Sequence, residues 1–301
     1  MKYLNFIIVS MFVFFTTSCY EDFEKDFETT YTYFASQKPL RTLVADADMS
    51  IKVGVAFAGK REVNPNDWAT FQIDNTLLDN YPDLELMPEK YYQLADKGKM
   101  TVTNPNLAIA DVEVTFSDEF YNDNAALNKY YAIPFRITGH NQDEIAKDAN
   151  GNLKDYSIVV VKFVSKYHGI YYRRGKKTNL TDGSVTEYYN KDLSQNEVVS
   201  FNSLGRYEVQ RPGFDVLNDT GMSINLKVNE NGSVDITAGG SVNIYDAIAV
   251  LETDSESLEF TGEQPKFVLR YKYQKDGVEY LVEEELIRRQ NPEDDLRFQE
   301  W

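Results

Sequence analysis

Apolar and polar residues alternate with a period of two along much of this chain, and this pattern constrains the fold more than any other feature. In residues 51–58, the side chains of Ile51, Val53, Val55 and Phe57 fall on one face of an extended segment. The alternation recurs in the segments TFQID, DVEVTF, SINLKV and FVLRYKY. Strands with one buried face are typical of antiparallel sheets, and turn sequences such as NENGS and KDG separate these segments. The sequence therefore predicts an all-β protein.

A change of structural unit is predicted near residue 166. The segment SIVVVKFVSKY (157–167) is apolar on both faces over its first half, which favours a central strand. A new unit begins at YHGIYYRRG. We therefore expect an immunoglobulin-like antiparallel β-sandwich over residues 30–165 and an antiparallel β-sandwich or barrel over residues 166–301, each near the usual size of a domain.

The first residues have the pattern of a secretory signal. Lys2 precedes an apolar run over residues 4–15, which is shorter than the about 20 residues that a membrane-spanning helix needs. The only cysteine of the chain, Cys19, follows three small polar residues. This arrangement resembles a bacterial lipobox, although Thr16 stands where Leu is commoner. Residues 1–18 are therefore predicted to be removed and Cys19 to be lipidated; the alternative is an ordinary signal peptide that leaves a free thiol.

Acidic residues dominate the segment 19–29 that follows. They are Glu21, Asp22, Glu24, Asp26 and Glu28. The segment resembles the acidic export tag of Bacteroidetes surface lipoproteins, which implies display on the outer face of the outer membrane. The alternative interpretation is a solvated tether, because like charges repel and extend a chain, and the two interpretations are compatible.

The chain as a whole is also acidic. It has 48 Asp and Glu residues against 31 Lys and Arg residues, and hence a net charge of -17. Such a chain repels the phosphates of nucleic acids, so no nucleic-acid partner is expected. Aromatic residues make up 14% of the sequence, which is too many for a disordered protein and fits a protein made of strands.

Motifs of common enzymes are absent from the sequence. It lacks G-x-S-x-G, a Walker loop, H-E-x-x-H and C-x-x-C. Of the two histidines, His140 is expected at the surface and His168 in a packed position. The segment DANGN (148–152) is interpreted as an Asn-Gly turn, because its glycine comes too early for a calcium-binding EF-hand. No enzymatic activity, metal or cofactor is expected, although carboxylates are numerous enough for a glycosidase.

Aromatic residues between polar turn residues are the candidates for ligand binding. Sugars bind to exposed aromatic faces, with carboxylates and amides serving their hydroxyl groups. The candidates are Trp68, Tyr121, Tyr188 and Tyr189. For each of them the alternative is that the ring packs over its own loop. Trp301, the last residue, is expected to cover the last strand.

Several segments resemble known families. DLELMPEKYYQL (83–94), YYAIPFRITG (130–139) and an early YFASQ carry a resemblance to the N-terminal domain, of unknown function, found in Bacteroidetes surface lipoproteins. KYHGIYYRRG and the final DLRFQEW resemble its companion C-terminal domain, also of unknown function. The N-terminal domain occurs before glycosidase modules and in proteins encoded beside glycan-import systems. The D-x-x-D-x-D-x-E pattern of the catalytic module is absent here, and no catalytic residue transfers.

The resemblance implies an association with glycans. The leading hypothesis is a surface-anchored, non-catalytic glycan-binding lipoprotein that captures polysaccharide for a Sus-type TonB-dependent importer, with the outer membrane contacted only through its lipid anchor. The alternative is a structural or adhesive surface lipoprotein that binds a protein. A hydrolase of unrecognised type is a third hypothesis.

Lipidation of Cys19 gives the first testable prediction. The Cys19→Ala variant should accumulate as an unprocessed or soluble precursor, because the acylated thiol is the anchor. Metabolic labelling with a fatty acid and membrane fractionation measure this. Unchanged fractionation with retained lipid label would contradict the prediction.

Overall fold

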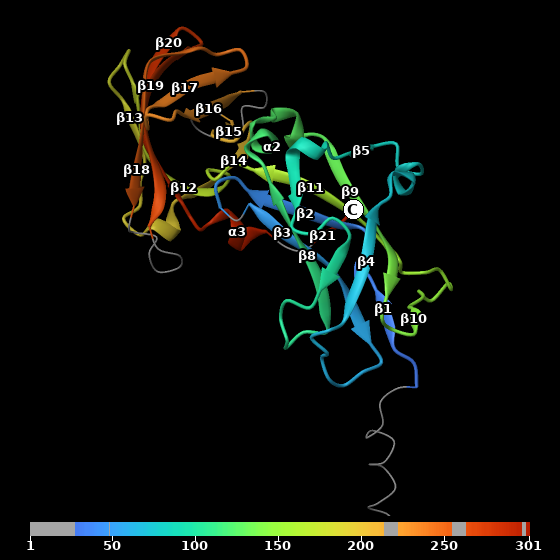
Figure 1. Cartoon of the computed structure of the whole chain (residues 1–301). Coiled ribbons are helices and arrows are strands. Elements are labelled where there is room, and N and C mark those ends of the chain that lie inside the picture. Colours follow the sequence, from blue (N-terminus) through green and yellow to red (C-terminus); the bar gives the residue numbers. More distant parts are fainter. Residues whose placement is uncertain (1–27, 48, 214–221, 255–262, 297–298) are drawn as a thin grey trace, which may run out of the picture.

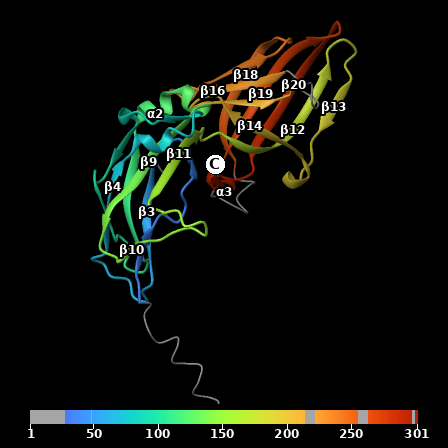
Figure 2. The ribbon, with the colours of Figure 1, turned by 90° about the vertical axis from the view of Figure 1, so that its right-hand side faces the viewer.

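The computed structural model describes residues 28–47, 49–213, 222–254, 263–296 and 299–301, and Cys19 lies outside these residues. The all-β prediction is confirmed: strands form two sheets that lie beside each other (Figures 1 and 2). The helices of the described residues are short: α2 (Asp118–Asn122), α3 (Pro292–Asp295), and the 3₁₀ turns η2 (Asn75–Leu78), η3 (Glu89–Tyr91), η4 (Asn124–Leu127) and η5 (Leu193–Gln195).

The first sheet has twelve strands in the described part of the chain and curls around an apolar core. Its main order is β10-β1-β3-β8-β7-β4-β9-β11-β2-β21, and β5 and β6 pair with β9 and β8. The strands are β1 (Tyr31–Tyr33), β2 (Pro39–Val44), β3 (Ser50–Ala58), β4 (Trp68–Ile73), β5 (Leu84–Leu86), β6 (Tyr92–Leu94), β7 (Lys99–Thr101), β8 (Ile109–Phe116), β9 (Tyr130–His140), β10 (Glu144–Ile145), β11 (Tyr156–Val164) and β21 (Gln299–Glu300).

The predicted alternation is present in this sheet. Val53, Val55 and Phe57 of β3 are buried in the core. In β11, Val159 points into this core while Ile158 joins a smaller apolar cluster on the other face, as expected for a central strand. The pairing is not purely antiparallel, however, because β1–β10, β2–β11 and β5–β9 are parallel. Each parallel pair joins segments that no hairpin connects, and turn signals therefore could not reveal it.

The second sheet closes into a barrel. Its order is β13-β12-β14-β15-β16-β17-β18-β19-β20, and an additional β12–β20 pairing joins the two ends, so that eight strands form the wall and β13 extends it. At this seam a Cβ on Gly175 would lie 2.3 Å from the carbonyl oxygen of Glu283, so glycine permits the close approach. The described strands are β12 (Gly169–Asn179), β13 (Val185–Tyr188), β14 (Glu197–Ser203), β15 (Glu208–Pro212), β16 (Ser223–Val228), β17 (Val234–Gly239), β18 (Ile244–Asp254), β19 (Gln264–Lys275) and β20 (Val278–Arg288).

An ionic contact joins the two sheets. Arg206, in the turn between β14 and β15, lies 2.6 Å from a carboxylate oxygen of Asp46 in the turn after β2, and 2.8 Å from Asp118. Lys166 approaches Asp46 from the linker at 3.3 Å. Since β11 ends at Val164 and β12 begins at Gly169, we propose the domain boundary between residues 165 and 166.

The end of the chain returns to the first sheet. β21 pairs with β2, and the indole Nε1 of Trp301 donates to the carbonyl oxygen of Ile158 at 3.0 Å. The indole meets the ring of Tyr81 edge-on at 5.0 Å. Figure 1 marks the C-terminus among the strands of the first sheet. The expectation that Trp301 covers the last strand of the second unit is therefore corrected. Trp301 packs on the first sheet, although residues 166–301 are expected to form the second unit.

This return predicts a measurable effect of Trp301 on stability. Trp301→Ala should lower the free energy of unfolding by about 1.5–3 kcal/mol, because it exposes the apolar cluster around Ile158. Leu107→Ala is the control, since Leu107 is 49% exposed and such a change typically costs under about 0.5 kcal/mol. Denaturant unfolding compares the variants, and equal stability of the two would show that the final residues contribute no packing energy.

Candidate functional site

Two consecutive arginines of β12 stack on two consecutive tyrosines at the end of β13. Neighbouring residues of a strand point to opposite faces, so Arg173 enters the barrel while Arg174 lies on its outer surface. The guanidinium carbon of Arg173 lies 4.2 Å from the ring centre of Tyr188, and that of Arg174 lies 5.1 Å from the ring centre of Tyr189. The β12–β13 hairpin therefore carries one arginine–tyrosine pair on each side of the wall.

The inner pair belongs to a buried ionic network centred on Glu284. This carboxylate accepts from Arg173 Nε at 2.6 Å, Arg211 Nη1 at 2.9 Å, Tyr188 Oη at 3.2 Å and Tyr271 Oη at 3.3 Å. Burial alone raises the pKa of the Glu284 carboxyl, but the charges of Arg211 and Arg173 outweigh burial and hold that pKa below its usual value. The network fixes the position of β13 against the barrel.

The outer pair borders a groove of about 520 Å³. Tyr189 is 59% exposed, and Arg174 beneath it donates from Nε to Glu285 at 2.8 Å. The groove is lined by Arg174, Gly175, Lys176, Glu187, Tyr189, Val268, Leu269, Arg270, Glu283, Glu284 and Glu285. An exposed aromatic face beside fixed carboxylates and guanidinium groups can stack on an apolar ligand face and hydrogen-bond to hydroxyl groups around it. We call this site the Tyr189 groove.

The structure separates the two tyrosines that the sequence grouped together. Tyr188 is half-buried and held by Glu284, whereas Tyr189 is the exposed member of the pair. The remaining lining residues were not predicted. The adjacent arginines in YYRRG and the acidic run in VEEELIRR could have indicated them, because adjacent charges in a strand must face both sides of its sheet.

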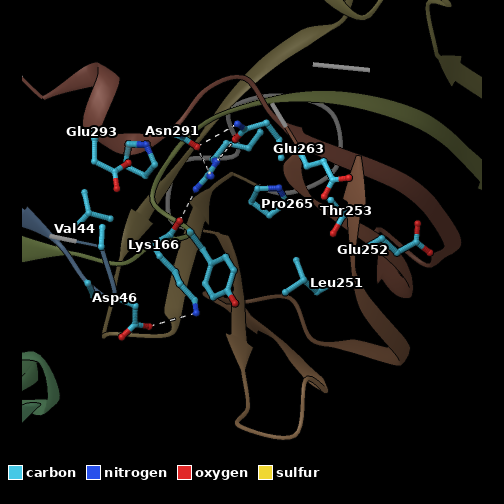
Figure 3. A pocket seen from close by; sticks show the side chains of 16 residues that line it. Val44, Asp46, Lys166, Leu251, Glu252, Thr253, Glu263, Pro265, Asn291 and Glu293 are labelled. Carbon is cyan, nitrogen blue, oxygen red and sulfur yellow. Dashed lines mark hydrogen bonds and ion pairs between the residues drawn. The ribbon is translucent and has the colours of Figure 1, made fainter. Parts of the chain in front are cut away.

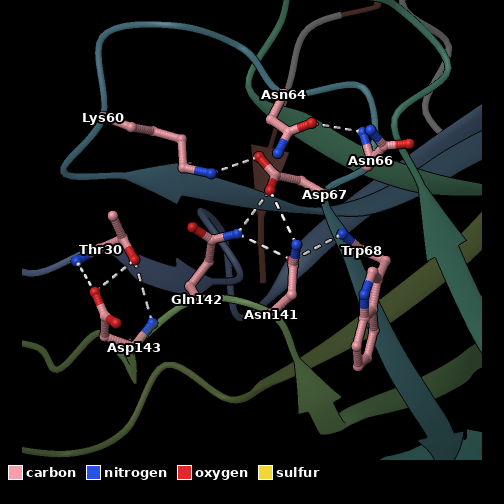
Figure 4. Close-up of polar contacts among 9 residues, drawn as sticks. All are labelled: Thr30, Lys60, Asn64, Asn66, Asp67, Trp68, Asn141, Gln142 and Asp143. Atoms are coloured by element: carbon pink, nitrogen blue, oxygen red, sulfur yellow. Dashed lines mark hydrogen bonds and ion pairs between the residues drawn. The ribbon is translucent and has the colours of Figure 1, made fainter.

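Trp68 lies at a second polar site, on the first sheet. Figure 4 shows Lys60, Asn141 and Gln142 converging on Asp67. The Asp67 carboxylate is 2% exposed and accepts from these three side chains at 2.6, 3.1 and 3.0 Å. Asn141 Oδ1 also accepts from the backbone N–H of Trp68 at 3.0 Å. The half-buried indole is therefore held beside a fixed set of amides, and Trp68 stays a candidate.

Tyr121 is corrected as a binding candidate. Its side chain is completely buried, and its ring packs against Phe120 and Phe163 at 5.2 and 5.4 Å between ring centres. The polar residues that flank Tyr121 in the sequence belong to α2 and to the loop that follows. The helix directs the ring of Tyr121 into the core. A buried ring offers no face to a ligand.

A cleft of about 620 Å³ lies between the two sheets. In Figure 3, Lys166 reaches towards Asp46 on one side of it, and Glu252, Thr253 and Glu263 line another side. The only aromatic residue among the described lining residues is Tyr167, which is 8% exposed. The cleft thus lacks the exposed aromatic face that distinguishes the Tyr189 groove.

The described residues show neither of two further features, a metal site or a membrane-spanning helix. They contain no group of three or more His, Cys, Asp and Glu side chains placed to hold a metal ion. Asp148 accepts from the backbone N–H groups of Asn150 and Asn152 within a turn. Within the same residues, no helix has the length and apolar character needed to cross a membrane.

Comparisons with known proteins found a family model and similar solved structures. A family model described as "-like, N-terminal domain" matches residues 26–144, in the half of the chain where the sequence resembles such a domain. No curated protein matches the chain. A crystal structure of a protein of unknown function from Bacteroides ovatus matches with a TM-score of 0.73 and 19% identity, over 91% of this chain and 98% of that one. An auxiliary nutrient binding protein from Bacteroides thetaiotaomicron matches with a TM-score of 0.37 and 12% identity, over 82% and 90%.

The buried network predicts a pH-dependent effect of Glu284 on stability. Glu284→Gln should lower the free energy of unfolding at neutral pH by about 3–5 kcal/mol, because it leaves two arginines buried without their counter-ion. Since the folded-state pKa lies below the usual value of 4.5, the contribution of Glu284 is fully present above that pH and is lost as pH falls through the folded-state value. The difference in the free energy of unfolding between Glu284→Gln and wild type should therefore become smaller as the pH falls.

Unfolding measured at several pH values checks this prediction. Glu85→Gln is the control, because both partners of the Lys129–Glu85 ion pair are exposed, at 42% and 51%, and exposed ion pairs contribute about 0–1 kcal/mol. A Glu284→Gln protein as stable as wild type at neutral pH would mean that the network does not support the barrel.

Proposed function

We propose that this protein is a non-catalytic glycan-binding lipoprotein that captures polysaccharide at the cell surface. The observation that carries the proposal is the Tyr189 groove, where a 59% exposed tyrosine lies over an arginine fixed by its own carboxylate partner. A sugar ring can stack its C–H face on Tyr189 at little entropic cost, because the aromatic ring has few rotatable bonds. Carboxylate and guanidinium groups along the groove can then bind the hydroxyl groups.

The composition of the groove supports sugar binding and offers no acyl-transfer chemistry among its described residues. Among its described lining residues there is no Ser, Cys or His, so the side-chain nucleophiles and bases of acyl-transfer enzymes are missing. The carboxylates Glu283 and Glu285 are engaged by neighbouring cations, which suits them to accept hydrogen bonds from sugar hydroxyls.

The membrane attachment proposed for this protein follows from its first residues. Cys19 would carry the lipid, and the acidic segment up to residue 29 would hold the folded part away from the outer membrane. In this arrangement the protein contacts the membrane only through its anchor. It would present polysaccharide to a Sus-type TonB-dependent importer.

Adhesion to a protein partner is the second candidate function. The second sheet carries exposed apolar side chains, among them Val185 at 52%, Val198 at 49% and Ile248 at 56%. Exposed apolar side chains can contribute to protein contacts. A protein that binds no glycan would support this second function.

A glycan array followed by calorimetric titration tests the proposal. Tyr189→Ala should weaken binding of an array-identified oligosaccharide by about ten- to a hundred-fold, or roughly 1–3 kcal/mol, as expected for the loss of a stacking anchor. Its melting temperature should hardly change, because the side chain is exposed. The Trp68→Ala variant, measured in parallel, shows whether the first sheet also contributes to glycan binding.

Tyr130→Ala serves as the control for the Tyr189 variant. Tyr130 is 49% exposed on the first sheet, outside the groove, so its loss should leave affinity unchanged. Equal affinity of the Tyr189→Ala protein and wild type would remove the groove from the binding site.

A further inference from the structure

We propose that the Tyr189 groove selects uncharged glycans and discriminates against polyanionic ones such as polyuronates and sulfated polysaccharides. This inference rests on the proposed function and adds the class of ligand. It follows from the way in which the charges of the groove are paired.

Each cation among the described lining residues of the groove lies next to a carboxylate. Arg174 Nε lies 2.8 Å from Glu285, Lys176 Nζ lies 3.2 Å from Glu283, and Arg270 Nε lies 3.9 Å from the same Glu283. A carboxylate or sulfate on a ligand would therefore compete with a protein carboxylate for each cation. Such an exchange of one ion pair for another yields little binding energy.

The cation closest to the stacking face is the least able to respond to an anion. The Arg174 side chain is 7% exposed, because Tyr189 covers it and Glu285 holds it. Moving it towards a ligand anion would break a partly buried ion pair and leave Glu285 without a counter-ion. Its role is thus to support the ring and not to attract charge.

The remaining charges of the groove are negative or already balanced. Glu187 adds a carboxylate to the rim, while the charge of Glu284 is compensated inside the barrel by Arg173 and Arg211. Apart from Glu284, the described lining residues therefore include three carboxylates and three cations. Around it, a chain with a net charge of -17 repels an approaching polyanion over distances up to a Debye length, about 8 Å at physiological ionic strength.

A paired set of probes tests this inference. Neutral cello-, manno-, xylo- and galacto-oligosaccharides are titrated into the full mature protein alongside oligogalacturonides and heparin-derived oligosaccharides. We expect at least one neutral probe to bind and the anionic probes to bind at least about tenfold more weakly. Raising NaCl from about 50 to about 500 mM should leave the neutral affinity within about twofold, because no ligand charge is involved.

Glu283→Gln provides the decisive variant. It releases both Lys176 and Arg270 from their shared carboxylate, so the ratio of the affinity for oligogalacturonide to the affinity for the neutral probe should rise by about fivefold or more. Glu279→Gln is the control, since Glu279 lies on the same strand β20 but accepts from Tyr245 outside the groove.

The outcomes separate the inference from the function on which it rests. Anionic probes that bind wild type as well as or better than neutral ones, with Tyr189→Ala reducing that binding, would overturn the selectivity and keep the glycan-binding function. An unchanged preference in Glu283→Gln would likewise overturn it. If no probe of either class binds, the proposed function itself fails.

Discussion

Glu284 is the residue on which the barrel and its groove depend. Burying a carboxylate costs several kcal/mol of lost hydration, and this cost is offset here by Arg173 and Arg211 and by two tyrosine hydroxyls. These partners come from β12, β15, β13 and β19, so one side chain links four strands of the same sheet. Because Tyr188 is one of them, the network also sets where β13 ends and which way the next residue, Tyr189, faces.

Contacts at the β14–β15 turn and at the end of the chain hold the two sheets together. Arg206 of the barrel binds Asp46 of the first sheet, where burial raises the pKa of the Asp46 carboxyl but the contacts with Arg206 and Lys166 lower it overall. The final residues cross back so that Trp301 packs on the first sheet. The barrel is therefore held at its β14–β15 turn and by the chain terminus, with the cleft between the sheets lying between Asp46 and Arg288.

The sequence was sufficient to predict strands but not long-range pairing. Alternation in β3 and the two-sided apolar pattern of β11 depend on local burial, and both were predicted from neighbouring residues. Parallel pairs and the return of Trp301 depend on contacts between distant segments, which no turn motif encodes. Among the candidates, Tyr189 is exposed and Tyr121 is buried although both lie among polar residues. The difference arises because α2 turns Tyr121 inward, and a three-dimensional contact of this kind leaves no mark in a local polar pattern.

A nuclear magnetic resonance titration can test whether a sugar stacks on Tyr189, as we propose. Protein with carbon-13-labelled tyrosine rings is titrated with the neutral oligosaccharide that binds most tightly, and the Tyr189 signals are assigned from the Tyr189→Ala variant. We expect the ring signals of Tyr189 to move saturably, with a dissociation constant equal to that from calorimetry, while those of the exposed Tyr130 stay in place. Saturation by the oligosaccharide with the Tyr189 signals unmoved would contradict it.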